Sequence, residues 1–539
     1  MKVFYSRHFL SSLAGGMLVE VIAEKKLRAK VLRNTTSICP ECNALISAEI
    51  LESNGKIYLR KVCPTHGEII ELYFGDSKIY HRFSKYAHDG KGVANPNVEI
   101  ASYSCPTNCG LCPGHISHTA LANIVVTNRC DLACWYCFFF AEKAGYVYEP
   151  TIEQIVEMVK VLRSMKPVPG NSVQLTGGEP ALRDDLPEII RAIKELGVDH
   201  VMLNTNGIRL AKDFEFFEKI KEAGVSNLYL SFDGVTPKTN PKNHWEVPMI
   251  LENARKLGVG IVLVPTIIKT VNDHELGEII RFGFKNADIV RSVNFQPVSL
   301  VGRMPRSERE RFRITIPDCI KLIEEQTGGE IPVDAWFPVP SCTPLTHLIE
   351  AITKRPRYEL SAHFACGAGT YVFKDGDRMV PITEFVDVDG LLKYLQDKAE
   401  EIEAGKNRFL AALSILWNFG KFIDERKAPS GMNIKRMLFN ILIKHDYRSV
   451  GDWHRKSIFI GMMHFQDKYN YDVERVRRCC IHYLVPDGRI IPFCAFNVIP
   501  EWYRDKIQRM YGIPIEEWER RAGRKLKDEI YRRIQQPSE

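Results

Sequence analysis

Short apolar runs alternate with helical periodicities through the middle of the chain. The apolar runs lie at 123–127, 172–176, 200–204, 227–232, 260–265 and 290–295. Such runs predict buried strands, and apolar residues spaced three or four apart predict amphipathic helices between them. Six strands that alternate with helices predict a parallel sheet with right-handed crossovers. This periodicity leaves open whether the α/β unit is an open, doubly wound sheet or a barrel.

Local signals place the boundaries of several of these helices. Thr151 and Gln154 have the spacing of a capping box at a helix start. Gly197 and Gly258 each follow an apolar helical face, where glycine commonly ends a helix. In either α/β architecture the active site lies at the C-terminal ends of the strands, so we search there for functional side chains.

The N-terminal region has a different pattern, in which two strand-like runs at 45–50 and 56–62 flank Asn54-Gly55. Asn-Gly between such runs predicts a tight β-hairpin. Pairs of candidate metal ligands precede and follow these runs in the sequence: Cys39 and Cys42 before them, and Cys63 and His66 after them. Cysteine pairs at this spacing are typical of a closed, four-ligand site in a zinc ribbon or a rubredoxin-like domain. Residue identity does not decide between zinc and iron.

Two unusually apolar segments with helical period lie late in the chain, at 409–423 and 432–444. Basic residues flank both. One interpretation is a helical hairpin within the core. The other is an amphipathic element that lies at a membrane surface. The charged segment 516–533 predicts a solvated helix.

Composition narrows the class of protein. The chain has 539 residues, of which 45% are hydrophobic and 26% are charged, and its formal net charge is +7. This length suggests about three domains. The charge is too modest to indicate nucleic-acid binding. No signal peptide and no membrane-spanning run is evident, and most of the fifteen cysteines have metal-ligand rather than disulfide spacing, so we expect a reducing, cytoplasmic setting.

The candidate chemistry is centred on a loop that follows the first strand of the α/β unit. Cys130, Cys134 and Cys137 lie within eight residues, with an aromatic residue, Tyr136, before the last cysteine. Three thiolates at this spacing can bind three irons of a 4Fe-4S cluster and leave the fourth iron open. The motif resembles the signature of the radical S-adenosylmethionine (SAM) enzymes, in which SAM occupies that open iron.

Motifs at the following strand ends strengthen the resemblance. Gly177, Gly178 and Glu179 follow the second strand, and two glycines there allow a close backbone approach to a ligand. The resemblance implies a partial (β/α)6 TIM barrel and implies that Glu179 holds the ammonium group of SAM. It further implies that the ends of the third and fourth strands contact the ribose and carboxylate of SAM, through Asn206, Ser231 and Asp233.

Further cysteines predict auxiliary iron-sulfur clusters. Cys105, Cys109 and Cys112 repeat the spacing of Cys130, Cys134 and Cys137, but no buried strand precedes them. We therefore assign them to a second cluster, whose fourth ligand is His115 or a distant cysteine. Five late cysteines lie in Gly-, Pro- and Asp-rich loops that suit a third cluster: Cys342, Cys366, Cys479, Cys480 and Cys494. A cluster needs four ligands, so we expect that one of the adjacent cysteines, Cys479 or Cys480, does not bind it. A structural metal or free buried thiols are the alternatives.

Taken together, these cysteine groups and the Gly-Gly-Glu-Pro motif resemble the archaeal tetraether lipid synthase group. That resemblance implies carbon-carbon coupling between the terminal methyl carbons of archaeol-type lipid tails by hydrogen abstraction. It implies an archaeal ether lipid substrate, peripheral contact with the inner membrane face, and an electron donor such as a ferredoxin or flavodoxin. It also implies about three 4Fe-4S clusters, SAM and one mononuclear iron or zinc as cofactors.

Two other functions remain open at this point. One is a radical SAM methylase that acts on a pterin-type cofactor, and the other is a non-catalytic iron-sulfur electron carrier or zinc-ribbon interaction protein. The expected domains are an N-terminal metal-binding domain, an auxiliary cluster segment, a radical SAM core, and a C-terminal auxiliary iron-sulfur cluster domain that binds substrate: 1–90, 91–120, 121–315 and 316–539.

Overall fold

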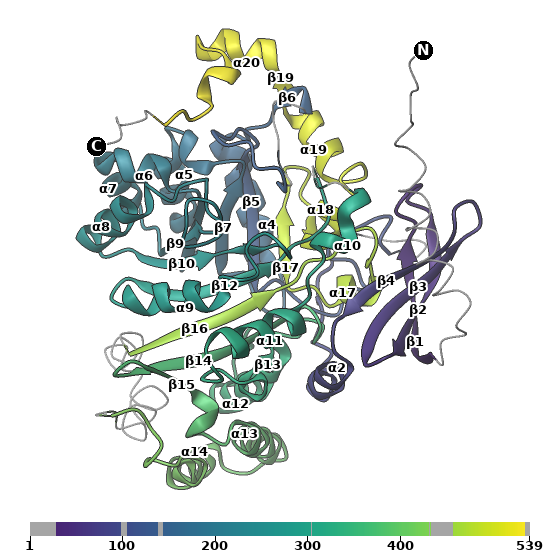
Figure 1. Cartoon of the computed structure of the whole chain (residues 1–539), viewed down its shortest axis with the longest axis vertical. Helices are drawn as coiled ribbons and strands as arrows, with labels where there is room; N and C mark the ends of the chain where they lie inside the picture. The colour runs from purple at the N-terminus through teal and green to yellow at the C-terminus, as the bar shows by residue number, and fades with distance from the viewer. Residues whose placement is uncertain are drawn as a thin grey trace, which may run out of the picture.

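Two β-sheets organise the molecule (Figure 1). The computed structural model describes residues 29–98, 105–137, 139, 144–302, 304, 306–430, 432 and 456–533. A four-stranded antiparallel sheet is built from the N-terminal residues, and a thirteen-stranded sheet holds the rest of the chain together. The first carries the predicted hairpin, and the second carries the predicted parallel strands.

The small sheet is a meander in which each strand pairs with the next. Its elements are β1 (Lys30–Ile38), β2 (Leu45–Ser53), β3 (Lys56–Cys63) and β4 (Gly67–Phe74), followed by helix α2 (Ser77–Ser84). Asn54 and Gly55 both have positive φ angles, 49° and 72°. Positive φ at both central residues is the backbone that a two-residue hairpin needs, and Asn-Gly adopts it readily. The predicted hairpin is confirmed.

The small sheet is fixed to the large domain by a buried polar seam. Asp472, fully buried, accepts hydrogen bonds from Thr35 Oγ1 and Tyr73 Oη, both at 2.7 Å, and forms an ion pair with Arg33. Burial alone would raise the pKa of Asp472, but the Arg33 guanidinium holds it well below its usual range. A buried charge that is paired and hydrogen-bonded in this way resists separation of the two sheets, since either charge left alone would be costly.

The predicted parallel unit is confirmed strand by strand. Its strands pair in parallel in the order β5, β7, β8, β9, β10, β12. Their bounds are β5 (Leu121–Thr127), β7 (Ser172–Gly177), β8 (His200–Thr205), β9 (Asn227–Ser231), β10 (Gly260–Val264) and β12 (Val290–Pro297), with the two-residue β11 (Thr266–Ile267) beside β12.

Helices with buried apolar faces connect these strands. They are α4 (Ile152–Ser164), α5 (Leu186–Glu195), α6 (Ile208–Lys212), α7 (Phe214–Glu222), α8 (Val247–Leu257) and α9 (Leu276–Lys285), with α10 (Arg309–Phe312) and α11 (Ile316–Gln326) after the last strand. Thr151 and Gln154 form both hydrogen bonds of the predicted capping box. Gly258 caps α8 with φ +66°, which confirms its predicted role.

Strands from the last third of the chain extend this sheet at both edges. Strand β16 (Ser457–Met463) pairs in parallel with β12, and β17 (Ile481–Leu484) pairs in parallel with β5. Outside them lie β13 (Phe337–Pro338), β14 (Gly367–Asp375), β15 (Arg378–Pro381) and β18 (Ile490–Pro492). Within the described residues the strand order is an open path, so the barrel remains a prediction, as do the domain boundaries. The six predicted strands are therefore the middle of a larger sheet.

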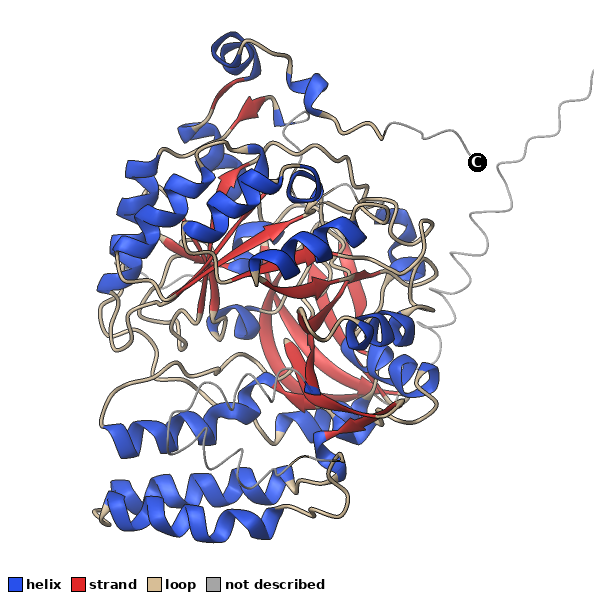
Figure 2. Cartoon of the chain, turned by 90° about the vertical axis from the view of Figure 1, so that its left-hand side faces the viewer, coloured by secondary structure: helices blue, strands red, loops and turns tan. Residues whose placement is uncertain are grey.

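Three helices form a layer at one end of the molecule, opposite α20 (Figures 1 and 2). They are α12 (Thr343–Thr353), α13 (Val388–Glu403) and α14 (Arg408–Asn418). The first apolar segment thus is a helix, with Ala411 and Ile415 buried while Trp417 is 90% exposed. The second apolar segment, after Met432, lies outside the described residues. No helix in the described part of the chain is long and apolar enough to cross a membrane.

The C-terminal part closes over the strand ends. It contains α17 (Val473–Arg477), α18 (Phe493–Val498), α19 (Arg504–Tyr511) and α20 (Ile515–Ala522), with β19 (Ile513–Pro514) paired to β6 (Tyr146–Val147). The predicted helix at 516–533 is shorter than expected, because Gly523 ends α20 in the left-handed conformation, with φ +66°.

Candidate functional site

A cavity of about 380 Å³ lies at the C-terminal ends of the parallel strands. Its wall includes residues from β5, β7, β8, β9 and β12 and from the late strands β16 and β17. Most of the side chains predicted to bind the cluster and SAM line it: Cys130, Cys134, Tyr136, Cys137, Gly177, Gly178, Glu179, Asn206 and Ser231. The motifs chosen from sequence are thus brought together at one place.

Backbone N–H groups of the loop itself hold two of the three thiols, Cys130 and Cys137. Leu132 N–H donates to Cys130 Sγ at 3.4 Å, and Phe139 N–H donates to Cys137 Sγ at 3.3 Å. Burial, with the Asp131 carboxylate, raises the pKa of Cys130 well above its usual value, and burial raises the pKa of Cys134 to about 11. Burial thus favours the neutral thiol form of Cys130 and Cys134. A bound iron centre supplies the positive charge that makes coordinating thiolates stable in such a place.

The two glycines of the Gly-Gly-Glu motif bring its loop against the cysteine loop. A Cβ on Gly177 would lie 2.0 Å from the Thr127 carbonyl oxygen, and one on Gly178 would lie 1.9 Å from the Arg129 carbonyl oxygen. Gly178 N–H donates to the Thr127 carbonyl at 2.8 Å. We expected the two glycines to let the backbone approach a ligand. They instead let the Gly-Gly-Glu loop pack against the cysteine loop, and this contact fixes Glu179 beside the thiols.

Glu179 is a buried carboxyl with three donors around it. Thr205 Oγ1 and Asn206 N–H donate to it at 2.7 Å, and Ala181 N–H donates at 2.9 Å. Burial and the neighbouring Asp131 carboxylate raise the pKa of Glu179 to about 8. Asp131 in turn accepts a hydrogen bond from Asn206 Nδ2 at 2.7 Å. Two buried acids this close attract a cation, which fits the ammonium group expected at Glu179.

A lysine that the sequence analysis missed completes the polar wall. Lys242 is buried, and its Nζ lies 2.8 Å from Asp233 Oδ2 and 2.5 Å from Ser231 Oγ. Tyr136 Oη donates to the same Asp233 carboxylate. Burial alone would lower the pKa of Lys242, but Asp233 and the nearby Cys134 raise it overall. Asp233 is thus committed to Lys242 and Tyr136 within the protein. No spacing motif includes Lys242, so no sequence signal identified it.

Side-chain amides on four of the parallel strands line the rest of the cavity. They are Asn123 on β5, Gln174 on β7, Asn204 on β8, and Asn294 and Gln296 on β12. An amide carries both a donor and an acceptor, so such a belt can match a ligand rich in ring nitrogens and carbonyl groups.

An aromatic group forms another part of the wall. Phe465, Tyr483 and Phe493 line the cavity, and the Phe465 and Phe493 rings are stacked with centroids 3.9 Å apart. Flat aromatic surfaces of this kind suit a planar ligand, because offset stacking is favourable.

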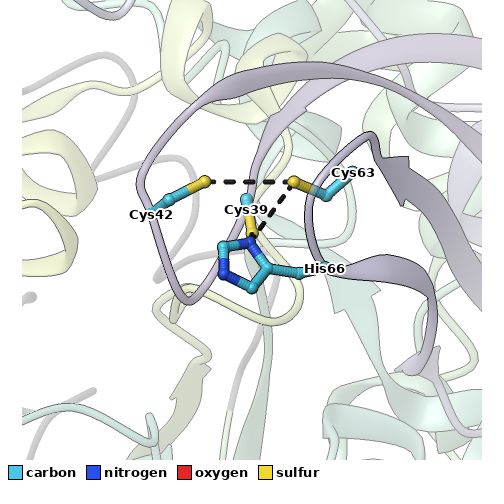
Figure 3. Close-up of side chains that lie close together, drawn as sticks. All are labelled: Cys39, Cys42, Cys63 and His66. Atoms are coloured by element: carbon cyan, nitrogen blue, oxygen red, sulfur yellow. Dashed lines mark hydrogen bonds between the residues drawn. The ribbon is translucent and has the colours of Figure 1, made fainter.

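The predicted N-terminal metal ligands converge as expected (Figure 3). Cys39 and Cys63 Sγ each lie 3.5 Å from His66 Nδ1, and Cys42 Sγ lies 3.9 Å from Cys63 Sγ. All four ligand atoms are within 4.8 Å of one another. Three thiols and one imidazole at this separation fit a single tetrahedral zinc or iron.

Two cysteines of the second triplet, Cys105 and Cys109, belong to the same apolar cluster as Cys137 and Cys494. Cys109 N–H donates to Tyr503 Oη at 3.1 Å, which anchors the loop to the C-terminal region. The candidate fourth ligand, His115, has its Nε2 at 2.8 Å from the Cys479 carbonyl oxygen. That nitrogen is therefore engaged, and Cys105, Cys109 and Cys112 remain a predicted cluster site without an assigned fourth ligand.

Two of the late cysteines, Cys366 and Cys494, lie near the buried Arg475. Arg475 Nε donates to Cys366 Sγ at 3.2 Å, and the thiols of Cys366 and Cys494 counter the burial of Arg475 and raise its pKa. Cys494 and Cys366 in turn are among the groups that raise the pKa of Cys479, after burial itself. Cys480 is also buried, near Cys366.

Cys342 stands apart from this group. It is exposed at the start of α12. Arg475 was not identified from the sequence. A guanidinium beside thiols favours the anionic form that they take when they bind a metal. The assignment of these cysteines to a cluster stays a prediction.

The class of the protein follows from this site and from family matches. Residues 124–283 match the radical SAM superfamily, and residues 31–75 match the HMPTM N-terminal zinc ribbon domain. The chain is therefore a radical SAM protein with an N-terminal zinc ribbon. Membership of this superfamily implies a 4Fe-4S cluster and SAM, and the ribbon fits one mononuclear metal. The number of clusters, about three, stays a prediction.

A relative of nearly the same length identifies the family. The 7,8-dihydro-6-hydroxymethylpterin dimethyltransferase of Methanocaldococcus jannaschii is 46% identical over 498 residues, which are 90% of this chain and 97% of that protein. The chain belongs to the family of this dimethyltransferase.

Other similarities are confined to part of the chain. The GTP 3',8-cyclase of Aquifex aeolicus is 33% identical over 189 residues, 33% of this chain and 57% of the cyclase. The crystal structure of methylornithine synthase covers 40% of this chain and 64% of its own, with 19% identity and a TM-score of 0.30.

The expected lipid synthase activity is wrong. The near full-length relative is a pterin dimethyltransferase, which agrees with the alternative function and not with carbon-carbon coupling of lipid tails. An archaeal ether lipid as substrate is wrong for the same reason. The motifs behind that expectation were cysteine groups, and these report which cofactors are bound and not which substrate is transformed.

Proposed function

We propose that this protein is a radical SAM methyltransferase that methylates a reduced, hydroxymethyl-substituted pterin. The observation that carries the proposal is the polar cavity beside Cys130, Cys134 and Cys137, with its belt of side-chain amides. A pterin presents ring nitrogens, an amino group and a carbonyl on one edge, which amides can pair as both donors and acceptors. The family relationship supports the same substrate class.

The shape of the cavity supports a small, flat substrate. Its volume is about 380 Å³, within the usual range for small-molecule sites. The aromatic side chains of Phe465, Tyr483 and Phe493 offer a stacking surface for the pterin rings. A site of this kind holds a heterocycle by its edge and its faces, which fixes the position of one carbon for attack.

Several of the predicted site residues have a role in this proposal, as does Lys242. Cys130, Cys134 and Cys137 would hold three irons of a 4Fe-4S cluster, and Glu179 would accept the ammonium group of SAM. Together, the cluster and SAM supply a carbon radical that abstracts hydrogen. Lys242 holds Asp233 and Ser231 in place at the end of β9. Phe139 and Leu132 line the cavity next to the thiols and exclude water from it.

We further propose that an electron donor such as a ferredoxin or flavodoxin reduces the protein. The grouping of Cys105, Cys109, Cys137 and Cys494 in one apolar cluster supports a route for electrons through auxiliary clusters. Burial of such groups away from water keeps other reactions from consuming the electron.

An anaerobic assay tests the proposed function. The reconstituted protein is incubated with SAM, a strong reductant and 7,8-dihydro-6-hydroxymethylpterin, and products are measured by mass spectrometry. We expect 5'-deoxyadenosine together with a pterin that gains the mass of one and then two methyl groups. Deoxyadenosine without a methylated pterin would contradict the substrate. Absence of deoxyadenosine would contradict the enzyme class and favour an electron carrier.

A further inference from the structure

A second group of metal-ligating side chains lies outside both the cavity and the zinc ribbon. It consists of His88, which follows α2, His347 on α12, and Glu359 in the loop after α12. One ligand atom of each residue lies within 4.8 Å of the others. Three separate segments of the chain therefore meet at two imidazoles and one carboxylate.

Hydrogen bonds fix which nitrogen of His347 faces Glu359. Gln396 Nε2 donates to Glu400 Oε1 at 2.9 Å, so the Gln396 carbonyl oxygen is the atom that faces His347. That oxygen lies 3.2 Å from His347 Nδ1, which must therefore carry the hydrogen. Nε2 of His347 is left facing Glu359 Oε1 at 3.3 Å. An outer amide that orients a histidine in this way is the usual support of a metal-binding imidazole.

The carboxylate is equally well positioned. Glu359 is fully buried, and its Oε2 accepts a hydrogen bond from Lys91 N–H at 2.8 Å. Its other oxygen, Oε1, is the one that faces His347. The Lys91 ammonium lies 3.4 Å from Oε1 and is also paired with Glu350. The carboxylates of Glu350 and Glu359 and the ammonium of Lys91 together carry one net negative charge when the histidines are neutral. This charge attracts a further cation.

We propose that His88, His347 and Glu359 form a binding site for a divalent transition-metal ion, with Zn²⁺ as the ion to test first. Two imidazole nitrogens and one carboxylate oxygen are a donor set that zinc accepts, with water as the fourth ligand. Because none of the three residues lines the cavity, the ion would act by joining the loop after α2 to α12 and to the loop that follows it.

Metal counting on the whole protein tests this site. The holoprotein, with clusters and ribbon metal loaded, is dialysed against Zn²⁺ and the bound zinc is measured. We expect His347→Ala and Glu359→Gln each to bind one molar equivalent less than the wild type, with unchanged iron. Gln396→Ala should keep the ligands but bind this zinc about 10- to 100-fold more weakly, because the orienting amide is lost.

His81→Ala is the matched control, since it removes an imidazole on the neighbouring helix α2 that pairs with Glu52 and not with the three ligands. It should retain the full zinc equivalent. Co²⁺ gives a second readout, because this site contains no sulfur and should add weak d–d bands without sulfur-to-metal charge-transfer absorption. Equal zinc binding by the wild type, His347→Ala and Glu359→Gln, with normal iron content, would overturn the proposal and leave an imidazolium–carboxylate pair.

Discussion

The zinc ribbon and the cavity beside Cys130, Cys134 and Cys137 differ in how their functional residues are distributed along the chain. The four ribbon ligands all lie within residues 39–66, at the open end of one hairpin, where β2 begins and β3 ends. The cavity instead collects side chains from Leu121 to Phe493, including residues of β16 and β17, which flank the six central strands on either side. A local site can form as soon as its hairpin forms, whereas a distributed site needs the complete sheet. We therefore expect that a substitution which abolishes metal binding at one site leaves the other site intact.

The largest predicted effect is the loss of SAM cleavage in Cys134→Ala. Two thiolates cannot replace the three that hold the cluster, so we expect 5'-deoxyadenosine formation at background level. The ribbon metal should remain at one equivalent, because no ribbon ligand is changed. Product is measured by chromatography and metal by mass spectrometry on the same sample.

Cys42→Ala is the opposite change and completes this test. It should lose the ribbon metal and keep cluster-dependent SAM cleavage. If Cys42→Ala also abolished cleavage while the protein retained its other iron, the two regions would be coupled, for example by electron transfer through the ribbon. The polar seam at Asp472 would then be more than a structural contact.

The next effect concerns the buried ion pair in the cavity. Lys242→Met leaves Asp233 buried without its cation, and breaking such a pair costs about 3–5 kcal/mol. We expect a thermal midpoint several degrees lower and weaker SAM binding. Lys238→Met, on an exposed side chain of the same loop, is the matched control and should change neither.

A double variant separates charge from packing at this pair. Lys242→Met with Asp233→Asn removes both charges, so the double variant should lose less free energy of unfolding than the two single variants lose together. Simple additivity would contradict a direct interaction between Lys242 and Asp233.

Sequence signals and structure agree best where the relevant contacts are local. Asn54-Gly55, the Thr151 capping box and the cysteine triplets depend on neighbours a few residues away, so each was predictable. Lys242 lies in a long connection between β9 and α8 that has no periodicity, and it meets Asp233 only in the folded chain.

Strands β16 and β17 show the same limit for the fold. They join the sheet beside partners that lie more than a hundred residues away, and an apolar run does not reveal its pairing partner. The substrate was harder still to predict, because the amides that line the cavity are spread over several strands and form no sequence motif.

A smaller effect is expected from pH at Glu179. Its pKa is raised from 4.5 to about 8 by burial and by Asp131, so without ligand the folded protein keeps a proton that the unfolded chain releases in this window. Stability of the ligand-free site should therefore fall as pH rises from about 4.5 to about 8, and stay level above that. Glu179→Gln should flatten this dependence and weaken SAM binding at pH 8.

Thermal midpoints across this pH range provide the measurement. Glu188→Gln changes an exposed carboxylate on α5 and should keep the wild-type pH dependence. An unchanged slope in Glu179→Gln would show that the buried proton is held elsewhere, with Asp131 as the next candidate, because the two acids lie close together.

The smallest effect is predicted at the far end of the molecule, on α14. Trp417 is 90% exposed, so Trp417→Gln should change the free energy of unfolding by no more than about 0.5 kcal/mol. Ile415 on the same helix is 5% exposed, and Ile415→Ala should cost about 2–5 kcal/mol. Thermal unfolding and sedimentation of both variants test this contrast. An exposed side chain has no packing to lose. A large loss of stability in Trp417→Gln, or a change in its association state, would therefore show that the exposed face of α14 is covered in solution.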